Sequence, residues 1–220
     1  MESHSAAMAS ATEVRPHLRG WFHVLAAVAA IALAPILIVA ADGAASVTAA
    51  AIYAGGVIAL FVVSGTYHRV FFTTRYAPLA RRLDHSMIFV FIAATYTPFA
   101  LLALDGISSI IVLVIAWAGA VVGIAINMLW IHAPSWVTVA PYLAVGWCIV
   151  PFIDEVFRGL GGAGFTLLLI GGLVYTLGAL VYATRLPNPW PTWFGYHEVF
   201  HLLVVGAVAL HYVSIAFYAI

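Results

Sequence analysis

Seven long apolar stretches, joined by short connections, make up almost the whole of this 220-residue chain. A helix needs about 20 mostly apolar residues to cross the hydrocarbon of a bilayer. The stretches cover residues 21–41, 47–63, 85–104, 108–129, 137–153, 164–182 and 196–219, and we expect the second to continue to His68. The sequence therefore predicts an all-α membrane protein, a bundle of seven transmembrane helices.

The composition excludes the soluble classes of protein. Only 7% of the residues are charged and 65% are apolar, whereas a soluble domain carries roughly 25% charged residues. The formal net charge is zero, which gives no sign of a nucleic-acid partner. The single cysteine, Cys148, rules out an internal disulfide.

The arginines predict the orientation of the bundle, because positive charge is retained on the cytoplasmic side. With the N-terminus inside, seven of the eight arginines fall in inner segments, and Arg158 alone is outside. We therefore expect a cytoplasmic N-terminus and an outer C-terminus, with residues 1–20 as a short cytoplasmic segment and 21–220 as one domain of the plasma membrane. A competing interpretation makes the first stretch a cleaved signal peptide, but its apolar part is longer than the 7–15 residues usual for such a core.

Six polar residues interrupt the apolar stretches at one expected depth. Two pairs are spaced four residues apart, which puts each pair on one helical face, and a third pair opens the stretch 85–104. With the N-terminus inside, all of them lie toward the cytoplasmic leaflet, although they come from distant parts of the chain. They are Ser64 and His68, Asp84 and His85, and His197 and His201.

Three of these imidazoles suit a zinc ion. Neutral histidine nitrogens are good zinc ligands, and three protein ligands leave a fourth position for water. We expect His197 and His201, together with a third histidine from another helix, to bind Zn²⁺, with Asp84 orienting the water or taking its proton, and Ser64 hydrogen-bonding nearby. The alternative is that these are ordinary interfacial histidines, solvated or hydrogen-bonded to neighbouring helices.

Residues 197–201, His-Glu-Val-Phe-His, also fit the zinc-protease pattern H-E-x-x-H, in which Glu198 would be the general base. Such an enzyme takes its third ligand from farther along the chain. His211 is the remaining candidate there, and it lies about 15 Å up the same helix, too far to share the metal. The alternative is that Glu198 is an interfacial charge favoured by the helix dipole.

The other histidines have simpler interpretations. We expect His211 to face the interior of the bundle as a packing or hydrogen-bonding residue. The rest lie near an interface or in the N-terminal segment, and we expect them to be solvated: His4, His17, His23 and His132.

Three separated blocks of sequence resemble the hemolysin III family, the bacterial branch of the progestin and adiponectin receptors. The blocks are Ser-Gly-Thr-Tyr-His at 64–68, Leu-Asp-His-Ser at 83–86 running into Ala-Thr-Tyr-Thr-Pro-Phe at 94–99, and His-Glu-Val-Phe-His at 197–201 with Ala-Leu-His at 209–211. The resemblance implies a seven-helix bundle with a zinc ion in its cytoplasmic half. Its ligands would be His68, His197 and His201, with Asp84 holding a water there and Ser64 beside the site. The family pattern does not require glutamate at 198.

The first functional hypothesis is a zinc-dependent membrane hydrolase that cleaves a lipid amide or ester, with a membrane lipid as substrate. The second is a non-enzymatic, zinc-stabilised sensor or regulator of lipid homeostasis. Two others follow from the family name and from the H-E-x-x-H pattern: a cytolysin and an intramembrane metalloprotease. The roles of Asp84 and Glu198 discriminate among them, whereas the oligomeric state is left open.

Overall fold

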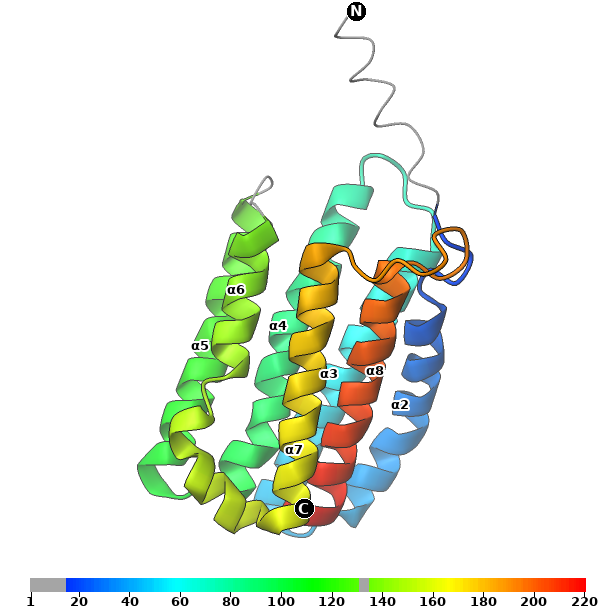
Figure 1. The fold of residues 1–220 in the computed structure, drawn as a ribbon. Coiled ribbons are helices and arrows are strands. Elements are labelled where there is room, and N and C mark those ends of the chain that lie inside the picture. Colours follow the sequence, from blue (N-terminus) through cyan, green and yellow to red (C-terminus); the bar gives the residue numbers. More distant parts are fainter. Residues whose placement is uncertain (1–14, 131–134) are drawn as a thin grey trace, which may run out of the picture.

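The computed structural model describes residues 15–130 and 135–220. This part of the chain consists of helices joined by short connections, with no strand beyond an isolated bridge between Trp190 and Phe194 (Figure 1). The helices are α2 (Trp21–Ala40), α3 (Gly43–Arg69), α4 (Ala77–Leu102), α5 (Gly106–Leu129), α6 (Ser135–Gly146), α7 (Ile153–Thr184) and α8 (Tyr196–Ser214), with a 3-10 turn η1 (Val150–Phe152) and a π-helical end η2 (Ile215–Ala219). The predicted all-α class is confirmed for this part of the chain. Most of the predicted N-terminal segment 1–20 lies outside the described residues, as do His4 and His132.

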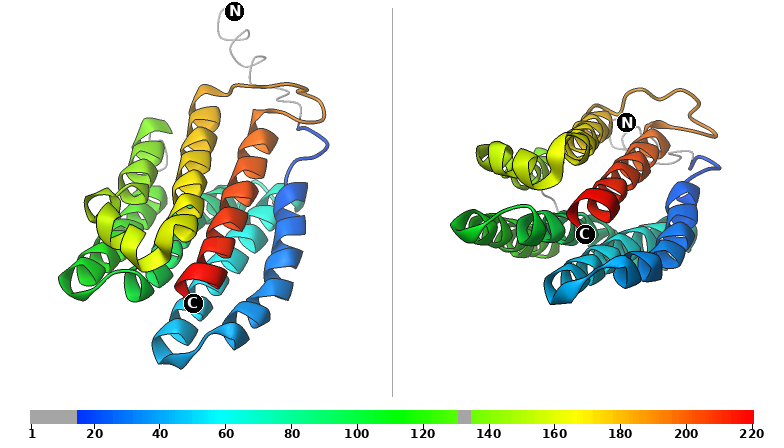
Figure 2. Two further views of the ribbon diagram at one scale, coloured as in Figure 1. Left: turned by 60° about the horizontal axis from the view of Figure 1, so that its bottom comes forward. Right: turned by 90° about the horizontal axis from the view of Figure 1, so that it is seen from below.

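Consecutive helices run side by side in opposite directions, and the last helix returns to the first (Figures 1 and 2). Helix α8 packs against α7 and also contacts α2. The start of α8 is thereby brought to the same end of the bundle as the start of α2 and the end of α3 (Figure 1). This closure brings together the helix ends that carry the predicted ligands His68, His197 and His201.

Six helical segments of the described chain are long and apolar enough to span a membrane. They are Trp21–Ala40, Gly43–Arg69, Ala77–Leu102, Gly106–Leu129, Ala140–Thr184 and Tyr196–Ala219. Large apolar side chains such as Leu25, Val39 and Val121 are exposed on their surfaces, as suits contact with hydrocarbon rather than water. The chain is a multi-pass membrane protein.

The stretch expected to form a span at 137–153 is divided in the structure. Helix α6 has 12 residues, which rise only about 18 Å, less than the hydrocarbon core of about 30 Å. Its continuation passes through η1 into α7, where Gly161 has φ 66° and breaks the helix. Hydropathy measures composition and not direction, so it could not reveal these turns. The seventh crossing and the orientation stay predictions.

Helix α4 begins about two turns earlier than expected, at Ala77 rather than His85. A proline near its first turn suits a helix start, and Arg81 and Arg82 make the first turns too polar for a hydropathy scan to include. Asp84 and His85 therefore lie inside a helix and not at its first residues. Helical hydrogen bonds fix the backbone of both residues, so the positions of their side chains are better defined than they would be at a helix end.

Candidate metal centre

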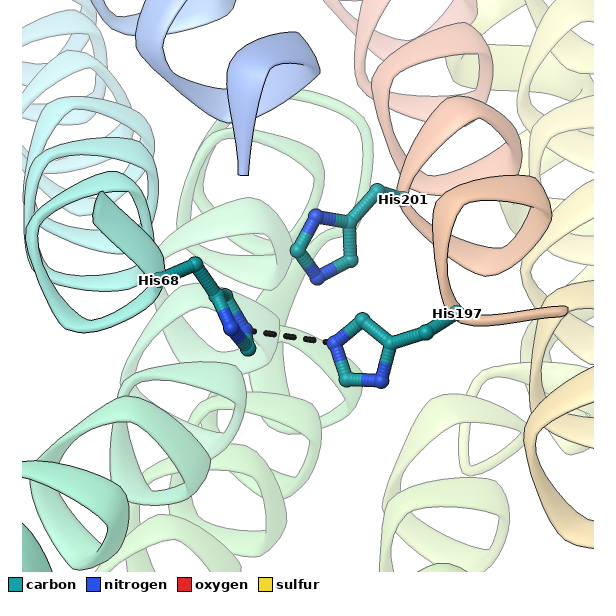
Figure 3. Close-up of side chains that lie close together, drawn as sticks. All are labelled: His68, His197 and His201. Atoms are coloured by element: carbon teal, nitrogen blue, oxygen red, sulfur yellow. Dashed lines mark hydrogen bonds between the residues drawn. The ribbon is translucent and has the colours of Figure 1, made fainter. Parts of the chain in front are cut away.

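Three histidine side chains lie close together, although the two helices that carry them are far apart in the sequence (Figure 3). His68 comes from the last turn of α3, and His197 and His201 come from the first turns of α8. Each offers a ligand nitrogen, and the three nitrogens lie within 4.8 Å of one another. The structure thus brings together the three residues that were predicted as ligands.

The spacing of the imidazoles fits a tetrahedral metal. The Nε2 atoms of His68 and His197 are 3.2 Å apart, and zinc–nitrogen bonds of about 2.0–2.1 Å place neighbouring ligands about 3.3 Å apart in a tetrahedron. His68 and His201 are both buried. Burial of several imidazoles so close together is costly unless their nitrogens are satisfied, and one cation would satisfy all three.

The carboxylate of Asp84 lies at the edge of this cluster. Its Oδ2 is 3.7 Å from Nε2 of His68, and its side chain is only 12% exposed. Ser64, one turn before His68 on α3, is buried beside Asp84. The residues expected to act with the histidines are therefore adjacent to them.

His85, the neighbour of Asp84, is not one of the three clustered histidines. Its Nδ1 donates to the carbonyl of Arg81 at 2.8 Å, which leaves Nε2 to accept from the hydroxyl of Tyr182 at 3.3 Å. Both nitrogens are therefore in use within the protein. The structure gives His85 no free nitrogen for a metal.

The prediction that His23 is solvated is wrong, because its side chain is buried. Its side chain, in the first turn of α2, is 3% exposed, and its ring stacks on the ring of His201. Neither of its nitrogens has a hydrogen-bond partner. The sequence held no signal for this, because His23 stands at the edge of an apolar stretch and its burial depends on α8. His17, in contrast, is exposed, as expected.

Glu198 is also buried, and it is fully enclosed rather than interfacial. One carboxylate oxygen accepts from the backbone N–H of Gly195 at 2.9 Å, which closes the first turn of α8. The other oxygen pairs with the guanidinium of Arg19. Glu198 therefore caps the helix that carries two of the histidines and ties it to the segment before α2. The predicted position at a helix N-terminus is confirmed.

Backbone hydrogen bonds also hold the segment before α2 against the loop that precedes α8. The N–H groups of His17 and Leu18 donate to the carbonyls of Thr192 and Trp193 at 3.0 and 3.2 Å. Gly20 follows, with φ +81°, and a Cβ on it would come within 2.6 Å of Cβ of His68. The backbone at Gly20 thus lies directly against a predicted ligand.

A cavity of about 200 Å³ extends from the histidine cluster into the bundle. Asp84, His197 and His201 line one end, and most of the wall is apolar. His211 lines the same cavity farther along α8, and its Nε2 donates to the carbonyl of Leu168 at 3.0 Å. The prediction that His211 faces the bundle interior is confirmed. The arrangement can hold a metal ion at one end of a cavity suited to an apolar molecule.

Comparisons with known proteins show the family of this chain. The family described as Haemolysin-III related matches residues 11–212. The chain is 31% identical to Hemolysin-3 of Bacillus cereus over 201 residues, which is 90% of this chain and 89% of that protein. It is 33% identical to the Hemolysin-3 homolog of Bacillus subtilis (strain 168) over 138 residues, 63% of this chain and 62% of that protein. A shorter match, 38% identical over 65 residues, joins 27% of this chain to 15% of the adiponectin receptor protein of Drosophila melanogaster. The chain belongs to the haemolysin-III family, within the adiponectin receptor superfamily.

Proposed function

We propose that this protein is a zinc-dependent hydrolase of a membrane lipid, acting on an amide or an ester. The observation that carries the proposal is the cluster of His68, His197 and His201, with Asp84 beside it, at one end of a largely apolar cavity. A polar reaction centre and an apolar binding space are what a water-consuming reaction on a lipid requires.

Each residue has a role that its position supports. The three histidines would hold the ion, which when bound supplies a Lewis acid for a carbonyl and activates water. Asp84, 3.7 Å from His68, would accept a proton from the attacking water as general base. Ser64 would hold the Asp84 carboxylate in position, and the apolar wall would receive the chain of the lipid and exclude bulk water.

The arginines support a cytoplasmic location for the site. Arg69 follows His68 at the end of α3, and Arg81 and Arg82 lie one turn or less before Asp84 on α4. Positive residues mark the cytoplasmic ends of membrane helices. We therefore place the site in the inner half of the plasma membrane, with the N-terminus in the cytoplasm.

The test is turnover of membrane lipid extract by purified protein in nanodiscs, with products measured by mass spectrometry. We expect Asp84→Asn to lower the rate at least about 100-fold, because general-base catalysis contributes about 10²–10⁴-fold, while metal content stays unchanged. Asp105→Asn is the matched control, because Asp105 is an exposed residue at the N-terminus of α5. No turnover by the metal-loaded wild type, or full activity of Asp84→Asn, would contradict the proposal.

One observation favours a second candidate function, a zinc-stabilised sensor or regulator. The cluster joins the end of α3 to the start of α8. An ion bound there would cross-link two helices that are far apart in the sequence and would stabilise the fold. In that case Asp84→Asn would leave the function in cells intact, whereas loss of His68 would lower thermal stability. A protease has less support, since both oxygens of Glu198 are already paired.

A further inference from the structure

The deep end of the cavity holds three buried polar atoms without partners. They are Oγ1 of Thr95 on α4, the hydroxyl of Tyr175 on α7, and Nδ1 of His211 on α8. All three residues line the same cavity as the histidine cluster. An unpaired buried polar atom is destabilising, so three of them on residues that line one space indicate that the space receives a polar group.

Two of the three side chains are in ring contact, and the third lies on the face of α4 that contacts both rings. The rings of Tyr175 and His211 are in contact, with centroids 5.4 Å apart. On α4, Phe91 contacts Tyr175 and Phe99 contacts His211, with centroids 5.9 and 6.0 Å apart. Thr95 lies one turn from each of these phenylalanines and on the same face of α4. The three residues Thr95, Tyr175 and His211 therefore form one pocket, called here the deep polar pocket.

The chemistry of the deep polar pocket selects a group that both donates and accepts. Nε2 of His211 carries the proton that it donates to the Leu168 carbonyl, so Nδ1 of the neutral ring is an acceptor. The hydroxyls of Tyr175 and Thr95 can each donate. A hydroxyl group matches this set, because it can donate to His211 and accept from Tyr175 or Thr95.

We propose that the deep polar pocket binds a hydroxyl carried on the apolar chain of the lipid whose head lies at the histidine cluster. His201 and His211 are ten residues apart on α8, a rise of about 15 Å, and the cavity lined by both connects the two ends. The substrate class is then a lipid hydroxylated about 15 Å from its reacting carbonyl. This inference rests on the proposed function for its assignment of the head group, but not for the pocket.

The test compares two probes that carry no scissile bond, lauric acid and ω-hydroxylauric acid, on full-length protein in nanodiscs. Binding is measured by intrinsic fluorescence, since Trp147 lines the cavity. We expect the hydroxylated probe to bind the wild type about fivefold more tightly, the gain of one or two net hydrogen bonds. The double variant Thr95→Val with Tyr175→Phe keeps the shapes and should abolish this preference while leaving the affinity for lauric acid unchanged.

Thr176→Val is the matched control, because Thr176 lines the same cavity but its hydroxyl already donates to the Gly172 carbonyl at 2.9 Å. This variant should retain the preference. Equal binding of the two probes to the wild type would show that the pocket holds only water and would overturn the proposal. A preference that survives in the double variant, or no binding of either probe, would overturn it as well. Because neither probe is cleaved, a hydroxyl preference without lipid turnover would reject the proposed hydrolase alone.

Discussion

The imidazole of His23 lies flat on the imidazole of His201, with ring centroids 3.7 Å apart and ring planes only 4° apart. A histidine binds a metal in the plane of its own ring. An ion in the plane of the His201 ring would therefore lie far outside the parallel plane of His23. His23 consequently supports His201 by stacking and is not a fourth ligand in this arrangement.

This relationship predicts different effects for two substitutions of His23. His23→Phe keeps an aromatic face against His201 and should leave zinc affinity within about threefold of the wild type. His23→Ala removes the support and should weaken zinc about tenfold, the size of effect expected when an orienting partner of a ligand is lost. Competition against a chromogenic chelator measures both. If the phenylalanine variant lost zinc completely, His23 would have to be a ligand.

Removing a predicted ligand should empty the site. We expect purified wild-type protein to carry about one zinc ion per chain, and His201→Ala to carry almost none by elemental analysis. Stripping the wild type with a chelator should lower its melting temperature, because an ion that binds the folded state stabilises it, and the same chelator should leave His201→Ala unchanged. His17→Ala, a change at an exposed histidine, serves as the control. A variant without His201 that still holds a full complement of zinc would refute the ligand set.

Gly20 and Gly43 offer a matched pair of glycines. Both have φ near +80°, but a Cβ on Gly20 would approach Cβ of His68 to 2.6 Å, whereas a Cβ on Gly43 would meet nothing within 4 Å. Each alanine variant should lose about 1 kcal/mol of stability from backbone strain. Gly20→Ala alone should also shift His68 and weaken zinc binding. Equal zinc affinities in the two variants would mean that the close approach at Gly20 does not matter for the site.

Glu198 should contribute to stability rather than to chemistry. Glu198→Gln removes the buried charge that pairs with Arg19, while Arg19 stays partly accessible to water. We expect a loss of about 1–3 kcal/mol in denaturation of the purified protein, with zinc content and lipid turnover per folded molecule within about threefold of the wild type. The double variant with Arg19→Met should be less destabilised than the sum of the single changes, because the two groups interact. Loss of turnover in a fully folded, zinc-loaded Glu198→Gln protein would instead favour the protease hypothesis.

The sequence sufficed for those parts of the site that depend on helical periodicity. His197 and His201 are four residues apart, as are Ser64 and His68, and such pairs share a helical face whatever surrounds them. The long apolar stretches predicted most of the spanning helices, because burial in hydrocarbon demands both length and composition. The structure agrees with those predictions.

Other features depend on contacts between distant parts of the chain. Burial of His23 requires α8 to close against α2, and the pairing of Glu198 requires Arg19 to lie across from it. The turns at the end of α6, and the meeting of Thr95, Tyr175 and His211, likewise follow from packing between helices. A local pattern records which faces of a helix are polar, but it holds no information about which other helix covers each face. That is why the amino-acid order alone put His197 and His201 on one helical face, whereas the neighbours of the histidine cluster and the deep polar pocket emerged from the folded arrangement.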